Sequence, residues 1–246
     1  MKTMKSIRII LKSRSTYRAV IVPLALLGAA GLSHATTTSA NLLVDPGFET
    51  QATLPSFASV VVDFSSTPNI WGAENGAFVG AENGVVPLGT RMLRMLNDGG
   101  TTTSTIQMIS LAAYASEIAA GNATFNMSAL FNTSADIGAP TAAINALFFA
   151  GPTSWGSPIG SGFASSLALD TNPTTWQTIA GSGTIPVGAG WVGLQVYFGN
   201  AALNGFAGYV DRNSETTGLT VTTVPEPSGT MLLGLGASIL LMRRRK

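Results

Sequence analysis

Short stretches in which apolar and polar residues alternate fill the middle of this 246-residue chain. The clearest is 123–132, where Phe125, Met127, Ala129 and Phe131 occupy every second position. Side chains that repeat with a period of two lie on one face of a β-strand, so this pattern places one face on a core and the other in water. The same alternation recurs at 191–198, and it predicts β-strands in the middle of the chain.

Such strand-like stretches recur at short intervals between turn signals such as Asn-Gly, Asp-Gly-Gly and Asn-Pro. One helical segment is predicted at 112–120, with Gly121 as its C-terminal stop. This spacing is typical of an antiparallel β-sandwich, an all-β fold, which we predict for the body of the chain. The predicted strands are 57–63, 91–96, 104–111, 123–132, 143–150, 164–169, 175–181, 191–198, 207–211 and 219–223.

The first 35 residues have the three parts of a secretory signal peptide. Six basic residues and no acidic residue lie between positions 2 and 18, an apolar run follows at 19–32, and a Ser-His-Ala cleavage site ends at Ala35. We predict export through the secretion translocon and cleavage by signal peptidase after Ala35, with Ala40 as a second possibility. An N-terminal membrane anchor is the weaker alternative, because the apolar run is short and contains a proline and two glycines.

The last 23 residues combine a Pro-Glu-Pro break, an apolar run and a basic end. Pro225 and Pro227 fix φ and remove two backbone donors, so the chain before the apolar run is extended and accessible to a protease. As a helix, the run 229–242 would be about 21 Å long, and the basic residues after it can reach lipid headgroups and stay on the cytoplasmic side. The tail is therefore either a processed sorting signal or a single-pass anchor behind a proline linker.

This tail resembles the PEP-CTERM sorting signal of Gram-negative bacteria, which some catalogues label an ice-binding protein C-terminal motif. The resemblance covers about the last tenth of the chain. It implies recognition by an exosortase, cleavage near the Pro-Glu-Pro, and delivery to the cell surface or the extracellular matrix. The matching residues are Val224, Pro225, Glu226, Pro227, Ser228, Arg243, Arg244 and Arg245.

Charge is distributed unevenly between the ends and the body, although the net charge of the whole chain is only +1. Between residues 36 and 224, three arginines stand against eleven acidic residues, which leaves −8. Nucleic acid is therefore not an expected partner, since phosphate binding needs a cationic surface. The chain has no cysteine, and its one histidine, His34, lies in the predicted signal peptide. Histidine-based triads, cysteine nucleophiles and histidine or cysteine zinc sites are thus excluded from the mature protein.

Several motifs of the body resemble carbohydrate-binding-module jelly rolls. The most distinctive is the opening Asn-Leu-Leu-Val-Asp-Pro-Gly-Phe-Glu at 41–49, and the stretches 89–95, 175–179, 191–198 and 209–211 follow in the usual order. The resemblance implies a jelly-roll sandwich with affinity for extracellular polysaccharide. The chain departs from the pattern near its end, where six residues separate Asp211 from the final apolar stretch.

In such modules the opening glutamate and a late aspartate often help to hold a structural Ca²⁺ ion. Carried over, the resemblance implies a calcium site at Glu49 and Asp211, and carboxylate oxygens are ligands that Ca²⁺ prefers. The alternative is that both residues lie solvated at an edge.

Sugar rings stack on exposed aromatic faces, so tryptophans on loops are the candidates for glycan contact. Trp71 precedes a glycine, and Trp155 lies in a stretch rich in proline, serine and glycine. Both are candidates for a loop at a rim, where they would stack on a glycan, but partial burial under a loop is the favoured interpretation. Trp176 and Trp191 fall inside strand patterns and are expected in the core.

Paired carboxylates provide the alternative function, a secreted glycan-modifying enzyme. Glycoside hydrolysis needs two carboxyl groups held about 5 to 10 Å apart across the bond, and no spacing in the sequence identifies such a pair. The available acids are Asp45, Glu49, Asp63, Glu74, Glu82 and Asp98.

The sequence thus predicts a signal peptide at 1–35, a β-sandwich at 41–223, and a sorting tail with a single hydrophobic, membrane-spanning helix at 224–246. The expected function is a non-enzymatic component of the cell envelope, the cell surface or the extracellular matrix that binds glycans, with the glycan-modifying enzyme as the alternative.

Overall fold

The computed structural model describes residues 35–56, 68–96, 102–135, 140–151, 157–160, 163–199, 208–211 and 218–224. Residues 36–224 form one compact unit with its own hydrophobic core. Apart from Ala35 and Val224, the predicted signal peptide and sorting tail lie outside the described residues. Among the described residues, no helix has the length and apolar character needed to span a membrane.

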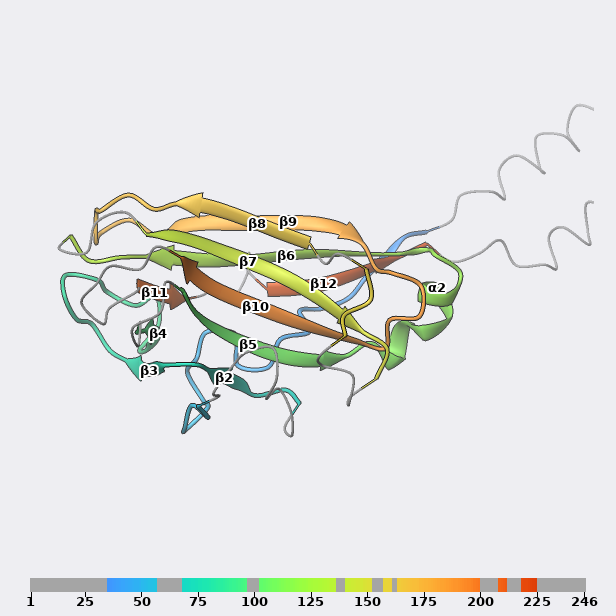
Figure 1. Cartoon of the computed structure of the whole chain (residues 1–246), viewed down its shortest axis with the longest axis horizontal. Coiled ribbons are helices and arrows are strands. Elements are labelled where there is room, and N and C mark those ends of the chain that lie inside the picture. Colours follow the sequence, from blue (N-terminus) through green and yellow to red (C-terminus); the bar gives the residue numbers. More distant parts are fainter. Residues whose placement is uncertain are drawn as a thin grey trace, which may run out of the picture. The chain divides into compact units, whose positions relative to one another are not determined.

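Two antiparallel sheets pack face to face in the body (Figure 1). The seven-stranded sheet has the order β1-β12-β6-β11-β4-β3, with β9 also paired to β6, and the five-stranded sheet has the order β2-β5-β10-β7-β8. The predicted antiparallel β-sandwich is thus confirmed. The described strands are β1 (Thr37–Thr38), β2 (Trp71–Ala73), β3 (Gly76–Val79), β4 (Met92–Met95), β5 (Thr102–Ser110), β6 (Ala123–Asn132), β7 (Thr141–Phe149), β8 (Phe163–Ala168), β9 (Gln177–Thr184), β10 (Trp191–Gly199), β11 (Gly208–Asp211) and β12 (Gly218–Thr223).

Most predicted strands lie within three residues of an observed strand, and β6 has the predicted bounds. The predicted helical segment is a short 3₁₀ turn, η1 (Ala112–Tyr114), followed by α2 (Ala115–Ala119), and Gly121 follows them with a φ of +75°. Strands β1, β2 and β3 were not predicted, whereas the predicted strand 57–63 lies outside the described residues.

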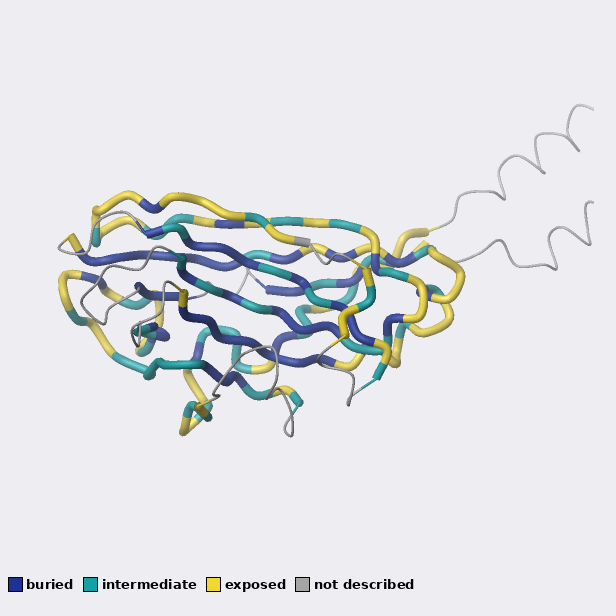
Figure 2. The backbone as a smooth tube through the Cα atoms, viewed as in Figure 1, coloured by how far each residue is buried: buried dark blue, intermediate teal, exposed yellow. Residues whose placement is uncertain are grey.

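The core lies between the sheets and is built from the inward side chains of the central strands. Phe131 of β6 packs edge-on against Phe198 of β10, with ring centroids 5.6 Å apart. Phe125 packs in the same way against Phe148 of β7, at 5.2 Å. Such tilted aromatic pairs stabilise a core beyond the area they bury. Figure 2 shows the buried residues running along these central strands.

The last strand of the sandwich is divided into β11 and β12, which pair with β6 end to end. Asp211 pairs with Leu130 and Gly218 pairs with Ser128, while β9 pairs along the opposite side of β6. Only Ala129 of β6 lies between these two registers. The interruption expected between Asp211 and the final apolar stretch is therefore present in the strand pairing.

The opening segment, residues 39–51, begins along β12 of the seven-stranded sheet and then crosses to the five-stranded sheet. Within it, Asp45 and Phe48 have positive φ values of 45° and 61°, unusual for residues other than glycine. The Asp45 carboxylate accepts backbone N–H bonds of 2.7 to 3.0 Å from Glu49, Thr50 and Gln51. These bonds offset the cost of the turn, and Phe48 is delivered into the core with only 1% of its surface exposed.

Two glutamine side chains fasten this segment to the five-stranded sheet by acting like peptide groups. The buried Gln107 amide of β5 accepts from the N–H of Val44 at 2.8 Å and donates to its carbonyl at 2.7 Å. Gln51 pairs in the same way with Trp71, at 2.8 and 2.7 Å. The opening segment therefore joins both sheets through backbone-like bonds.

We predict that Gln107→Leu, which keeps the volume but removes both bonds to Val44, lowers the free energy of unfolding of residues 36–224 by about 1 to 2 kcal/mol. The reason is that two part-buried hydrogen bonds, to the N–H and the carbonyl of Val44, are lost. Urea denaturation measures the change. Gln195→Leu is the control, because Gln195 is only partly buried on the outer face of β10. An equal loss in both variants would contradict the role given to Gln107.

Candidate functional site

The two predicted metal ligands, Glu49 and Asp211, both bind the loop 88–91. Asp211 accepts the backbone N–H of Leu88 at 2.7 Å. Glu49 accepts the N–H groups of Thr90 at 2.8 Å and Arg91 at 3.2 Å, as well as the Thr90 hydroxyl. The structure thus brings the opening glutamate and the late aspartate to the same loop.

Glycine at position 89 permits this close approach, since a Cβ there would collide with the Glu49 carboxylate. Partial burial raises the pKa of that carboxyl, but the hydrogen bonds from Thr90 and Arg91 outweigh this effect and hold the pKa below its usual value. Glu49 is therefore an ionised acceptor of N–H and O–H groups.

Calcium needs six to eight oxygen ligands. In the described part of the chain, no three aspartate, glutamate, histidine or cysteine residues lie close enough together to hold a metal ion. The Glu49 oxygens are already engaged by donors of the loop 88–91. Two carboxylates alone are too few for Ca²⁺, so an ion here would also need backbone carbonyls, and the calcium site at Glu49 and Asp211 stays a prediction of the sequence.

The interpretation that places Trp71 at an exposed rim is wrong. Trp71 is the first residue of β2 and only 2% exposed. Its ring lies 5.2 Å from that of Phe48, and its indole N–H donates to the Asp45 carbonyl at 3.0 Å. It lines a cavity of about 10 Å³, which has room for about one water molecule and not for a sugar. Trp71 therefore belongs to the core around the opening segment.

The other three tryptophans have separate outcomes. Trp155 lies outside the described residues. Trp176 precedes β9, is half-buried, and donates its indole N–H to the Val86 carbonyl at 3.0 Å. Trp191 is the first residue of β10 and is half-buried, with its side chain on the outer face of the five-stranded sheet. The expectation of a core position for Trp191 is therefore corrected by the register of β10.

That register gives β10 two faces. Val192, Leu194, Val196 and Phe198 point into the core, so the odd positions 191, 193, 195 and 197 face outward. The outward residues include Trp191 and Tyr197, both partly exposed, and Gln195 between them. The same alternation in the sequence could have revealed these residues, because it assigns Trp191 to the face opposite the core.

Neighbouring strands extend this outer face on both sides of β10. Gln195 lies opposite Asn145 of β7, whose amide donates to it at 3.0 Å, while the Asn145 Oδ1 atom is buried without a hydrogen-bond partner. At Gly193 the face has no room for a side chain, because a Cβ would lie 2.7 Å from Ile106 and 2.8 Å from Met108 of β5. The outward residues of β10 and their neighbours on β5 and β7 form what we call the β10 face: Ser104, Ile106, Met108, Ser110, Ala143, Asn145, Leu147, Phe149, Trp191, Gly193, Gln195 and Tyr197. Ile106, Met108 and Phe149 are buried, whereas Trp191, Gln195 and Tyr197 are partly exposed.

The outer face of the seven-stranded sheet has a different composition. Four threonines form a row across it, Thr184, Thr124, Thr222 and Thr38, and the next row is Ser182, Asn126 and Thr220. This is the polar composition normal for a solvated face of an antiparallel sheet. The β10 face departs from it by combining a small buried apolar cluster with two partly exposed aromatic rings, Trp191 and Tyr197, and two amides.

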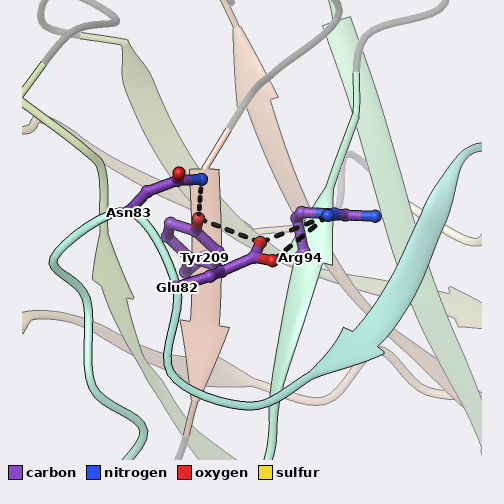
Figure 3. A network of polar contacts seen from close by, with 4 residues as sticks. All are labelled: Glu82, Asn83, Arg94 and Tyr209. Carbon is purple, nitrogen blue, oxygen red and sulfur yellow. Dashed lines mark hydrogen bonds and ion pairs between the residues drawn. The ribbon is translucent and has the colours of Figure 1, made fainter.

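A polar network on the seven-stranded sheet holds the loop 82–85 (Figure 3). The Tyr209 hydroxyl accepts from the Asn83 amide at 2.8 Å and donates to Glu82 at 3.0 Å, and Arg94 bonds both Glu82 oxygens at 3.3 Å. Burial raises the pKa of Tyr209 well above its usual value and outweighs the opposing hydrogen bond from Asn83. The phenol therefore stays protonated and serves as the donor to Glu82.

The acids proposed for the alternative enzyme have structural partners wherever they are described. Asp45, Glu49 and Glu82 hold the bonds given above, and Glu74 accepts the backbone N–H of Ser104 at 2.9 Å. Asp63 and Asp98 lie outside the described residues. Glu74 and Glu82 therefore each hold a neighbouring strand or loop.

Comparisons with known proteins find solved structures of similar fold but assign the chain to no family. No family model matches the chain, and no curated protein matches it. Among solved structures, TmCBM61 in complex with β-1,4-galactotriose is 15% identical over 76% of this chain and 100% of its own, with a TM-score of 0.40. The CBM22-1 xylan-binding domain from Paenibacillus barcinonensis Xyn10C is 12% identical over 72% and 100%, with a TM-score of 0.40. CBM35 from Cellvibrio japonicus Abf62 is 11% identical over 78% and 99%, with a TM-score of 0.38. These TM-scores are below 0.5, so the fold rests on the strand pairing and the function on the residues themselves.

We predict that a chelator leaves the melting midpoint of residues 36–224 unchanged, because N–H and O–H donors already satisfy Glu49. Thermal unfolding with EDTA and with added Ca²⁺ measures this, and Glu49→Gln should lower the midpoint equally in both conditions. Glu117→Gln, at a half-buried residue of α2 and with the same change of charge, is the control. A midpoint that rises with Ca²⁺ in the wild type and not in Glu49→Gln would establish the calcium site instead.

Proposed function

We propose that the body is a non-enzymatic glycan-binding module and that its ligand lies along β10. The observation that carries this proposal is the β10 face, where Trp191 and Tyr197 flank the amides of Gln195 and Asn145 on the outer side of a sheet. Aromatic faces stack on the apolar faces of sugar rings, and amides exchange hydrogen bonds with hydroxyl groups. The partly exposed Gln195 amide is the polar group of this face that a ligand hydroxyl can reach.

The arrangement favours an extended, neutral polysaccharide. Trp191 and Tyr197 are six residues apart on one strand, which separates them by about 20 Å. A single sugar is too small to contact both rings, whereas an internal stretch of a linear chain reaches from one to the other. No residue of the β10 face carries a charge, so a uronic acid or a sulfate group would find no cation there.

The described acidic residues support a function without catalysis. Asp45, Glu49, Glu74 and Glu82 each accept hydrogen bonds from the chain's own loops and strands. None of them belongs to the β10 face. Each of these carboxylates therefore has a structural role in the fold.

Export and sorting belong to the same proposal. We infer that the chain is exported across the inner membrane of a Gram-negative bacterium, that an exosortase recognises the PEP-CTERM tail, and that the body works at the cell surface or in the extracellular matrix. Val224 follows β12, is 42% exposed, and donates its N–H to the Asn122 carbonyl. Because β1 pairs with the end of β12, both processed ends leave the body at the same edge of the sheet, and cleavage removes no core residue.

We predict that Trp191→Ala and Tyr197→Ala each weaken binding of residues 36–224 to a neutral linear polysaccharide by roughly 3- to 10-fold, as expected for the loss of one stacked ring. Affinity electrophoresis in gels containing xylan, galactan or glucan measures binding. Trp176→Ala removes a half-buried tryptophan from a different part of the molecule and should leave binding unchanged.

Hydrolysis assays on the same polysaccharides accompany the binding measurement. Release of reducing ends by the wild type would contradict the non-enzymatic function. An equal loss of binding in the Trp176 variant, or no binding by the wild type to any neutral polysaccharide, would contradict the site on β10.

We also predict that the mature protein recovered from envelope and medium lacks peptides from both ends. Mass spectrometry should find no peptide before Ala35 and none from the basic end after Ser228. Pro225→Ala combined with Pro227→Ala is expected to retain the tail, because the extended break before the apolar run is lost. An intact Arg-rich end in the wild-type protein would show a permanent anchor in place of sorting.

A further inference from the structure

Strand β9 is a long open edge of the seven-stranded sheet. It contains eight residues and pairs through its whole length with β6. Its described backbone has no partner strand on the other side. Alternate N–H and carbonyl groups of an edge strand point away from the sheet and can pair with another strand.

The means that normally protect an edge strand are missing from β9. Charged side chains, proline and bulges usually prevent pairing between edges, yet β9 reads Gln-Thr-Ile-Ala-Gly-Ser-Gly-Thr and pairs in continuous register with β6. Its outward side chains, Thr178, Ala180, Ser182 and Thr184, are small and exposed. Nothing in this strand repels a second strand.

By contrast, the edge at β2 is closed by the protein itself. The Gln51 amide bonds to both the N–H and the carbonyl of Trp71, and Ala73 donates its N–H to the Pro55 carbonyl. The chain therefore covers one edge with side-chain and backbone groups, whereas β9 is left open.

Charge is also absent around this edge, although the body as a whole is strongly acidic. Residues 137–210 contain one charged side chain, Asp170. Strand β8, the edge of the five-stranded sheet, lies beside β9, and it is uncharged as well (Figures 1 and 2). Two copies that met at this side would not suffer the like-charge repulsion expected of a body with a net charge of −8.

We propose that β9 is a self-association surface, on which a second copy of the chain pairs its own β9 in antiparallel orientation. Identical strands are complementary in this arrangement. A two-fold axis at Gly181 places Thr178 opposite Thr184 of the partner subunit, and Ala180 opposite Ser182 of the partner subunit. Pairs of threonines across antiparallel strands are favourable, and the seven-stranded sheet continues from one copy into the next.

This association leaves the β10 face accessible, since β10 lies inside the other sheet. The proposal is therefore independent of glycan binding, and each can fail without the other.

Analytical ultracentrifugation of residues 36–224 from micromolar to millimolar concentration tests the proposal. The wild type should form dimers as concentration rises. Ser182→Lys places two lysines close to each other in the paired edge and should weaken dimerisation by about tenfold or more. Asn126→Lys is the matched control, because Asn126 lies opposite Ser182 in the same exposed row but one strand away from the edge.

Hydrogen exchange provides the second measurement, with amides of β9 expected to gain protection as the dimer forms and amides of β3 expected to remain unchanged. If Ser182→Lys also lowers the melting midpoint, Thr184→Lys at the end of β9 replaces it. A wild type that stays monomeric at every concentration would overturn the proposal, as would an equal effect of the Asn126 and Ser182 substitutions or protection of another strand in place of β9.

Discussion

The attachment of the opening segment to both sheets is the constraint on which the rest of this sandwich depends. The segment is hydrogen-bonded to β12 in one sheet and to the Gln107 amide in the other. Asp45 holds the strained turn between these two attachments, and that turn places Phe48 against Trp71. A side-chain amide is suited to this task because it offers one donor and one acceptor in a plane, as a peptide group does. The crossing therefore ties β12 of the seven-stranded sheet to β5 of the five-stranded sheet.

The acidic residues of the body serve the same purpose, which is to hold loops and turns in place. A sandwich built from short strands and many loops has backbone N–H groups that no ladder satisfies, and buried N–H groups need acceptors. Asp45, Glu49, Glu74 and Asp211 each supply carboxylate oxygens to such groups. The negative charge of the body is therefore partly a consequence of how its loops are held. The proposed site for a neutral sugar lies on strands that carry no charged residue.

Sequence patterns predicted the long strands well and the functional residues poorly, for physical reasons that differ from residue to residue. The alternation in 123–132 gave the bounds of β6, because a strand in the centre of a sandwich must bury every second side chain. Strands β2 and β3 have three and four residues, too few to show a period. Trp71 was expected on a loop because Gly72 follows it, and its burial depends on Phe48, far away in the sequence. For Trp191 the sequence did contain the signal: the apolar, core-facing residues of β10 occupy even positions, and Trp191 occupies an odd one.

Glycan binding and self-association, as proposed here, strengthen each other. A shallow face with two aromatic rings and two amides gives modest affinity for one chain, because few groups are removed from water and an exposed ligand keeps much of its freedom. Pairing through β9 would join two such faces in one particle, so that the second contact with a long polysaccharide becomes intramolecular and avidity rises without new contacts. A polymer matrix offers many equivalent stretches of chain to such a particle. An uncharged edge, a hazard for an isolated β protein, would then be useful outside the cell.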